Sequence, residues 1–136
     1  MPVKSSGRET SALSPLDAAH LAIEVLLEKK CQDILLLDIS RCSDLADYMM
    51  IATARSGRQA YAAVNELAMR LKKAGMQRIS LAGAEPGTWV VLDYGDIFVH
   101  VMQREQREYY DLEALWADAV VAKRIAGEAT PAAEVV

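Results

Sequence analysis

Residues 89–116 read WVVLDYGDIFVHVMQREQREYYDLEALW and carry the strongest structural signals of this 136-residue chain. Two apolar runs, at 89–92 and 97–102, flank the short connection Asp93-Tyr94-Gly95-Asp96. This spacing is typical of a β-hairpin, because Gly95 tolerates a positive φ and the two aspartates can accept hydrogen bonds from turn amides. The stretch therefore predicts two antiparallel strands, followed by a segment in which aromatic residues stand among acidic ones.

Helices and further strands are predicted on both sides of this hairpin from the spacing of apolar residues. Strands are predicted at 34–37, 48–52 and 79–82, in addition to 89–92 and 97–102. Two helices begin at serine caps, Ser14 and Ser56, and the second helix ends near Gly75. A helical turn at 104–109 then precedes a second turn that Asp111 can cap. In this second turn, one apolar face is predicted to contain Leu112, Leu115, Trp116 and Ala119.

The order of the elements is α-β-β-α-β-β-β-α, which predicts an α/β (α+β) fold. We expect a mixed five-stranded sheet with helices packed over it. A chain of 136 residues fits a single domain with one sizeable core. We therefore predict one domain at 14–122, a disordered leader at 1–13 and a flexible tail at 123–136.

The charge of the chain is unevenly distributed. The formal net charge is −4, yet residues 85–118 contain two arginines against eight acidic residues, so the rest of the chain is slightly positive. Phosphate is repelled by an acidic surface, which disfavours direct nucleic-acid binding through this part and favours a basic protein partner. A solvated acidic face without any partner is the simpler alternative.

Several classes of protein receive no support from the sequence. No apolar run approaches the ~20 residues that a membrane helix needs, and the first residues do not resemble a secretory signal. Cys31 and Cys42 lack the spacing of a redox motif or a zinc site, and His20 and His100 are isolated. We therefore predict no metal, no cofactor and a cytoplasmic location.

The best candidates for catalysis are Asp93 and Asp96, which could bind a divalent cation in a metal-dependent nucleotidyltransferase-like enzyme. The two acids are three positions apart on a tight turn, where aspartate commonly serves the backbone instead. We favour this structural interpretation and keep the enzyme as the alternative. Arg55 and Arg58, near the start of the second helix, could hold a phosphate or pair with acids of the chain itself.

Aromatic residues concentrate in the same stretch as the acids. Five of the eight aromatics of the chain are Trp89, Tyr94, Tyr109, Tyr110 and Trp116. The adjacent Tyr109 and Tyr110 cannot both face inward on a helix or a strand, so at least one should meet solvent or a partner. Tyrosine and tryptophan are frequent hot spots of protein interfaces. The pattern predicts a binding surface, whose partner could be another protein or a second copy of the chain.

Four motifs resemble the ribosomal silencing factor family, also called RsfS or Iojap. They read SDLADYMMIATARSGRQ at 43–59, EPGTWVVLDYGD at 85–96, LDYGDIFVHVM at 92–102 and REYYDLEALWADA at 107–119. The resemblance implies a nucleotidyltransferase-like fold that lacks catalytic residues. It also implies binding to ribosomal protein fourteen of the large ribosomal subunit, which blocks the small subunit from joining and represses translation. Members off the ribosome tend to form homodimers.

The resemblance further implies a partner-binding face on this chain. Its members would be Trp89, Asp93, Tyr94, His100, Met102, Glu105, Glu108, Tyr109, Tyr110, Asp111 and Trp116. Two departures from the family pattern, Ala46 and the pair Met49-Met50, lie outside this face. The implied mechanism is steric obstruction by a bound protein, without any chemical step.

Overall fold

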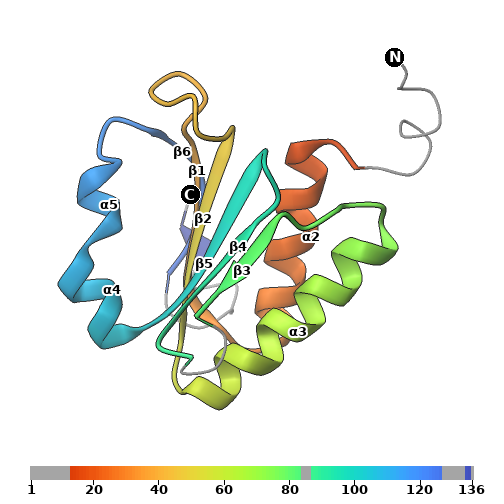
Figure 1. Cartoon of the computed structure of the whole chain (residues 1–136). Coiled ribbons are helices and arrows are strands. Elements are labelled where there is room, and N and C mark those ends of the chain that lie inside the picture. Colours follow the sequence, from red (N-terminus) through yellow and green to blue (C-terminus); the bar gives the residue numbers. More distant parts are fainter. Residues whose placement is uncertain (1–12, 84–86, 127–133, 136) are drawn as a thin grey trace.

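The computed structural model describes residues 13–83, 87–126 and 134–135 of the chain (Figure 1). The helices are α2 (Pro15–Glu28), α3 (Gly57–Lys73), α4 (Arg104–Tyr110) and α5 (Leu112–Leu115). The strands are β1 (Gln32–Asp38), β2 (Tyr48–Ala54), β3 (Ser80–Ala82), β4 (Trp89–Asp93), β5 (Ile97–Gln103), β6 (Val120–Ile125) and β7 (Glu134–Val135). No described helix has the length and apolarity needed to cross a membrane.

All described strands form one mixed sheet in the order β3-β4-β5-β2-β1-β6-β7. The pairing of β2 with β5 is parallel, and the other pairings are antiparallel. The parallel pair lies next to the predicted hairpin, which β4 and β5 form with Trp89 opposite Met102 and Asp93 opposite Phe98. The predicted α+β class with a mixed sheet is therefore confirmed.

The predicted number of five strands was wrong, because β6 and β7 extend the sheet beyond β1. The sequence of β6, VVAKRI, is exposed at every position except Ile125, so it carries no alternation of apolar and polar residues that would identify a strand. The predicted domain boundary at 122/123 falls inside this strand. Residues 1–12 of the predicted leader, and residues 127–133 and 136 of the predicted tail, lie outside the described residues.

Helices cover both faces of the sheet, as Figure 1 shows: α2 and α3 lie on one face, and α4 and α5 on the other. A large core cluster fills the space beneath α2 and α3. A smaller cluster on the opposite face includes Met102, with Trp89, Leu112 and Trp116 packed against it. Strand β1 serves both clusters, since Ile34 and Leu36 belong to the first and Leu35 and Leu37 to the second. Strand β1 is therefore covered on both faces, as its uninterrupted apolar run at 34–37 indicates.

The predicted ends of the two long helices are confirmed. The Oγ atoms of Ser14 and Ser56 accept hydrogen bonds from the backbone N–H groups of Asp17 and Gln59, both at 3.1 Å. Helix α3 stops before Gly75, which has a φ of 95°. These caps satisfy amides that a helix start otherwise leaves without partners, and they fix where α2 and α3 begin.

Gly87 allows β4 to begin close to the start of α3. Its φ is 73°, and a Cβ atom added there would lie 2.7 Å from the Cα atom of Gly57. We expect Gly87→Ala to lower the free energy of unfolding by about 2 kcal/mol or more, since a left-handed conformation alone costs ~1–2 kcal/mol and the clash adds to it. Urea denaturation measures the loss. Gly75→Ala, at an exposed position with positive φ, is the control. An equal loss of stability in both variants would contradict a role for the close approach of Gly87 to Gly57.

Candidate partner-binding surface

Four ring-bearing side chains form a continuous row across the start of β4, the middle of β5 and the end of α4. The ring centroids are 4.9 Å apart between Tyr109 and Tyr110, 4.8 Å between Tyr110 and Trp89, and 6.0 Å between Trp89 and His100. Pairs of aromatic rings attract each other at such separations. We call Tyr109, Tyr110, Trp89 and His100 the aromatic row.

The aromatic row is open at one end and closed at the other. Tyr109 is 81% exposed and Tyr110 is 53% exposed, which confirms that the two tyrosines do not both face inward. Trp89 is half-buried, and His100 is buried. A partner can therefore reach the tyrosines and an edge of the tryptophan, while the inner end of the row fixes their positions.

Acidic side chains are exposed on the same segment as the two tyrosines at the open end of the row. Glu105, Glu108 and Asp111 are exposed on α4 or directly after it. The arginines of α4 turn the other way, because Arg107 is buried and Arg104 pairs with Asp33. The outer surface of α4 is consequently acidic although the helix contains two arginines.

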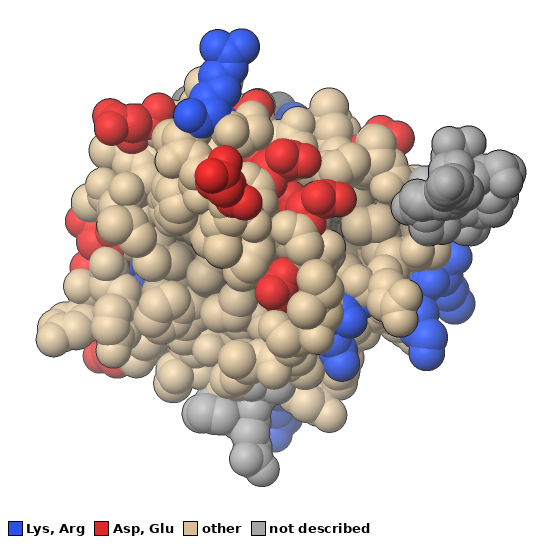
Figure 2. Space-filling model, turned by 45° about the horizontal axis from the view of Figure 1, so that its top comes forward, with Lys and Arg blue, Asp and Glu red and all other residues tan. Residues whose placement is uncertain are grey.

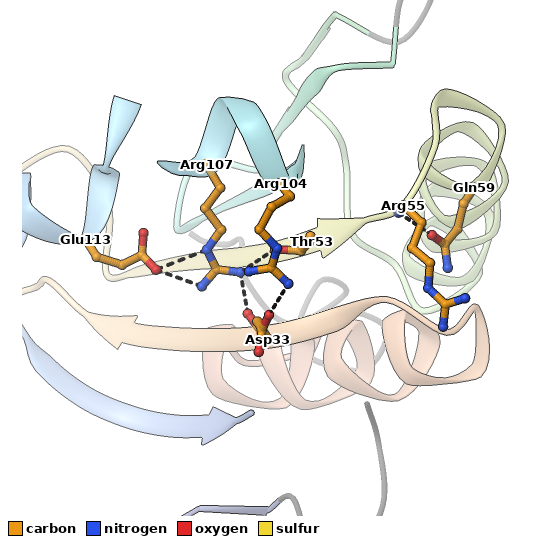
Figure 3. A network of polar contacts seen from close by, with 7 residues as sticks. All are labelled: Asp33, Thr53, Arg55, Gln59, Arg104, Arg107 and Glu113. Carbon is orange, nitrogen blue, oxygen red and sulfur yellow. Dashed lines mark hydrogen bonds and ion pairs between the residues drawn. The ribbon is translucent and has the colours of Figure 1, made fainter. Parts of the chain in front are cut away.

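Arg107 fastens α4 to the sheet, as the close view in Figure 3 shows. Its Nε and Nη2 atoms donate to a carboxylate oxygen of Glu113 at 3.0 and 2.8 Å. Its Nη1 atom donates to Thr53 Oγ1 at 2.8 Å and to the backbone oxygen of Asp33. Arg104 adds a bond to the Asp33 carboxylate at 2.5 Å. The two arginines thus hold α4, and with it Tyr109 and Tyr110, against β1 and β2.

Sequence reasoning missed this positioning role of Arg104 and Arg107. The available signal was their spacing, since residues three apart on a helix share one face. In a segment whose other charges are acidic, such a pair indicates a face that turns toward the body of the protein. The partners of the pair could not be identified, because Thr53 and Asp33 are far away in the sequence.

Asp111 separates α4 from α5 by a backbone conformation rather than by a side-chain cap. Its φ is 49°, its N–H donates to the oxygen of Arg107 at 3.0 Å, and its side chain makes no capping bond to α5. Asp111 thus stands at the predicted N-cap position of α5, but its side chain does not cap the turn. The predicted common face was wrong for Leu115, which is 71% exposed, because α5 ends after a single turn.

The other predicted surface residues lie apart from the open end of the row. Met102 is fully buried in the smaller cluster, and Trp116 is half-buried against it. Tyr94 is buried in the large cluster on the face of α2 and α3. Asp93 is half-buried at the opposite end of β4 from Trp89. The structure thus brings together the aromatic row with Glu105, Glu108 and Asp111, and it leaves Asp93 and Tyr94 at the distant hairpin turn.

Of the two acids considered for catalysis, Asp93 serves the turn that carries it, whereas Asp96 bonds through its backbone oxygen to the segment before β2. Asp93 Oδ1 accepts from the backbone N–H of Gly95 at 2.8 Å. The backbone oxygen of Asp96 accepts from the N–H groups of Asp47 and Tyr48 at 2.9 and 3.1 Å. Figure 2 brings the top of Figure 1 forward, where the β1–β2 and β4–β5 connections lie, and shows acidic residues gathered on that face. Within the described parts of the chain, no three His, Cys, Asp or Glu side chains group as metal ligands.

His100 is buried in its neutral form. Its Nδ1 atom accepts a hydrogen bond from Trp89 Nε1 at 3.0 Å, which places the ring proton on Nε2. Burial lowers the pKa of His100 from the ordinary value of 6.5 to about 4, because the interior disfavours the charged imidazolium. The inner end of the aromatic row therefore depends on an uncharged histidine.

This burial predicts a loss of stability in mild acid. Between pH 6.5 and 4 the unfolded chain binds a proton at His100 that the folded chain does not, so stability is complete above pH 6.5 and falls as the pH approaches 4. The gap between the two pKa values corresponds to about 3 kcal/mol at most. Urea denaturation at pH 7 and pH 4.5 measures the loss. His100→Gln keeps an acceptor for Trp89 but does not titrate, so it should lose clearly less stability, whereas His20→Gln on the exposed side of α2 should behave like wild type.

Known proteins match nearly the whole chain. A family model described as "Ribosomal silencing factor during starvation" matches residues 12–135. A Chromobacterium violaceum protein named ribosomal silencing factor RsfS is 44% identical over 100 residues, which cover 74% of this chain and 82% of that protein. The protein of the same name from Bacillus subtilis is 38% identical over 95 residues, covering 70% and 80%. A crystal structure of a Chromobacterium violaceum protein is similar with a TM-score of 0.75 at 39% identity, covering 88% of this chain and 98% of that one.

Proposed function

Because this chain belongs to the ribosomal silencing factor family, we propose that it binds the large ribosomal subunit through ribosomal protein fourteen. In this proposal the bound protein occupies space that the small subunit needs, so the two subunits cannot join and translation falls. The observation that carries the proposal is the open aromatic row with its acidic surroundings. We further propose that the protein acts in the cytoplasm and without catalysis.

The chemistry of the row suits a basic protein partner. Tyr109 and Tyr110 offer large rings that lose little rotamer entropy when a partner covers them. Glu105, Glu108 and Asp111 supply negative charge at the margin, where complementary charge speeds association and orients the partner. Ribosomal proteins are generally basic, so the surface and the proposed partner complement each other in charge.

Obstruction requires affinity and bulk rather than a reaction. A dissociation constant near ~1 μM corresponds to about −8 kcal/mol, which a few desolvated aromatic side chains with flanking charges can supply. Arg107 and Arg104 support this function indirectly, because they hold α4 in one position before the partner arrives. A surface that is already ordered loses less entropy on binding.

Two further properties belong to the same proposal. We propose that the fold is nucleotidyltransferase-like and lacks catalytic residues. We also propose that the protein forms homodimers off the ribosome. The dimer and the ribosome could compete for the aromatic row, so the two interactions are best measured on the same set of variants.

Sedimentation of separated ribosomal subunits tests the proposed function. Saturating protein should reduce the amount of joined ribosomes and should itself sediment with the large subunit. Tyr110→Ala should restore joining, whereas Tyr61→Ala should not, because Tyr61 is equally exposed at 54% but lies on α3 on the other face. Undiminished joining at saturating wild-type protein would contradict the proposal.

A titration with magnesium and nucleotides tests the enzymatic alternative. If Asp93 and Asp96 held a metal for nucleotidyl transfer, calorimetry should detect binding that Asp96→Asn weakens. We expect no heat of binding with either magnesium or manganese. Binding that depends on Asp96 would favour the enzyme over the obstructing protein.

A further inference from the structure

A groove of about 630 Å³ opens at the C-terminal end of α3, on the face of the sheet opposite the aromatic row. Its walls come from the last two turns of α3, the segment that follows Gly75, and the hairpin turn after β4. Pockets that hold small molecules typically measure ~300–1,000 Å³. The size of the groove thus suits a small organic molecule.

The lining of the groove combines an apolar floor with positive charge. Met69, Met76 and the ring of Tyr94 provide apolar surface, and Lys72 and Arg78 are the charged residues among those that line it. None of the described lining residues is acidic. An anion is therefore attracted, and the long unbranched methionine side chains can adapt to the shape of an apolar body.

A buried hydroxyl group adds a specific donor. Tyr94 is only 6% exposed, and its Oη atom has no hydrogen-bond partner among the described residues. Burying a hydroxyl group without a hydrogen-bond partner costs free energy. A ligand that accepts a hydrogen bond from this group removes that cost, so the bond contributes more to the binding free energy than the same bond would at a solvated hydroxyl. The charge of Arg78 acts on the same hydroxyl and opposes the effect of burial, which raises the pKa of Tyr94. Tyr94 and Arg78 both line the groove.

We propose that this groove binds a small carboxylate carried on a compact apolar body. One carboxylate oxygen accepts from Tyr94 Oη, the negative charge meets Arg78 and Lys72, and the apolar body covers Met69 and Met76. Reaching the hydroxyl requires a shift of one of the flexible side chains that line the groove. The site is separate from the aromatic row and does not depend on the ribosomal role.

Titration of the full chain with hexanoate, followed by nitrogen–proton correlation spectra, tests this site. Saturable shifts are expected at the amides of Gly75, Met76 and Tyr94, with none at Trp89. Tyr94→Phe and Arg78→Gln should each raise the dissociation constant at least fivefold. Lys73→Gln, which removes an exposed cation of α3 outside the lining, should leave it unchanged.

Controls separate the parts of the proposal. Hexanamide, which lacks the charge, and inorganic phosphate, which lacks the apolar body, should both bind more weakly than hexanoate. Equal binding of either molecule, or hexanoate binding that Tyr94→Phe and Arg78→Gln do not weaken, would overturn the assignment. Tyr94→Phe should be at least as stable as wild type toward urea, because it removes a hydroxyl without a partner. A clearly less stable variant would reveal a structural bond at this hydroxyl and also overturn the proposal.

Discussion

Replacing Arg107 with methionine is expected to lower the free energy of unfolding by about 3 kcal/mol. Removing one partner of a buried ion pair typically costs ~3–5 kcal/mol, because the remaining groups stay desolvated without compensation. The lower end applies here, since Glu113 is 33% exposed and can regain water. The variant also removes the donor that satisfies Thr53 Oγ1, which is buried. Urea denaturation at neutral pH measures the loss.

Two further variants separate the contributions to this effect. Arg104→Met removes a pair whose arginine is 49% exposed, so it should cost below about 1 kcal/mol. The double variant Arg107→Met/Glu113→Gln should lose less stability than the sum of the two single variants. Each single change leaves one charge of the pair without its partner, whereas the double change removes both charges. Strict additivity of the two would show that the ion pair is energetically irrelevant.

Tyr110→Ala should weaken binding to the large ribosomal subunit by about 1–3 kcal/mol, which corresponds to roughly 5- to 150-fold in affinity. Tyr110 is expected to show the larger loss within the row because its ring contacts both Tyr109 and Trp89, so truncation leaves both neighbours without support. Tyr109→Ala and Trp89→Ala should fall in the same range. Fluorescence-based titration with purified large subunits gives the affinities.

Controls for this prediction distinguish binding from folding and from dimerisation. Tyr61→Ala removes a tyrosine of similar exposure and should keep full affinity. Unfolding must be measured alongside for Trp89→Ala, since Trp89 also packs on the smaller core cluster. Light scattering reports the oligomeric state of each variant. If Tyr110→Ala abolished dimers and spared ribosome binding, the aromatic row would belong to the homodimer alone.

The sheet centre and the long helices were predictable because their signals are local. A run such as Ile34–Leu37 is apolar at every position, as a strand covered on both faces must be. Ser14 and Ser56 serve as caps through bonds to amides three residues away, so sequence spacing alone identifies them. The hairpin turn followed in the same way from Gly95 and Asp93.

The remaining features depend on residues that are distant in the sequence. Strand β6 exists because β1 offers it a free edge, not because its own exposed residues favour burial. Burial of Arg107 depends on Thr53 and Asp33, which lie 54 and 74 positions away. The aromatic row was predicted only as a concentration of rings. Packing decides which of these rings are exposed to solvent. It also decides that Tyr94 lies on the other face of the sheet.

The parallel pair β2–β5 has a consequence for how the chain is made. Its strands meet only after α3, β3 and β4 have been traversed, so Tyr48 finds Ile97 across a long intervening stretch. Closing such a distant contact is slow compared with forming a hairpin, and synthesis proceeds from the N-terminus. During translation, α2, β1 and β2 must therefore wait, with one edge of β2 unpaired, until the last residues of β5 leave the exit tunnel. We expect nascent chains arrested before that point to be sensitive to proteases.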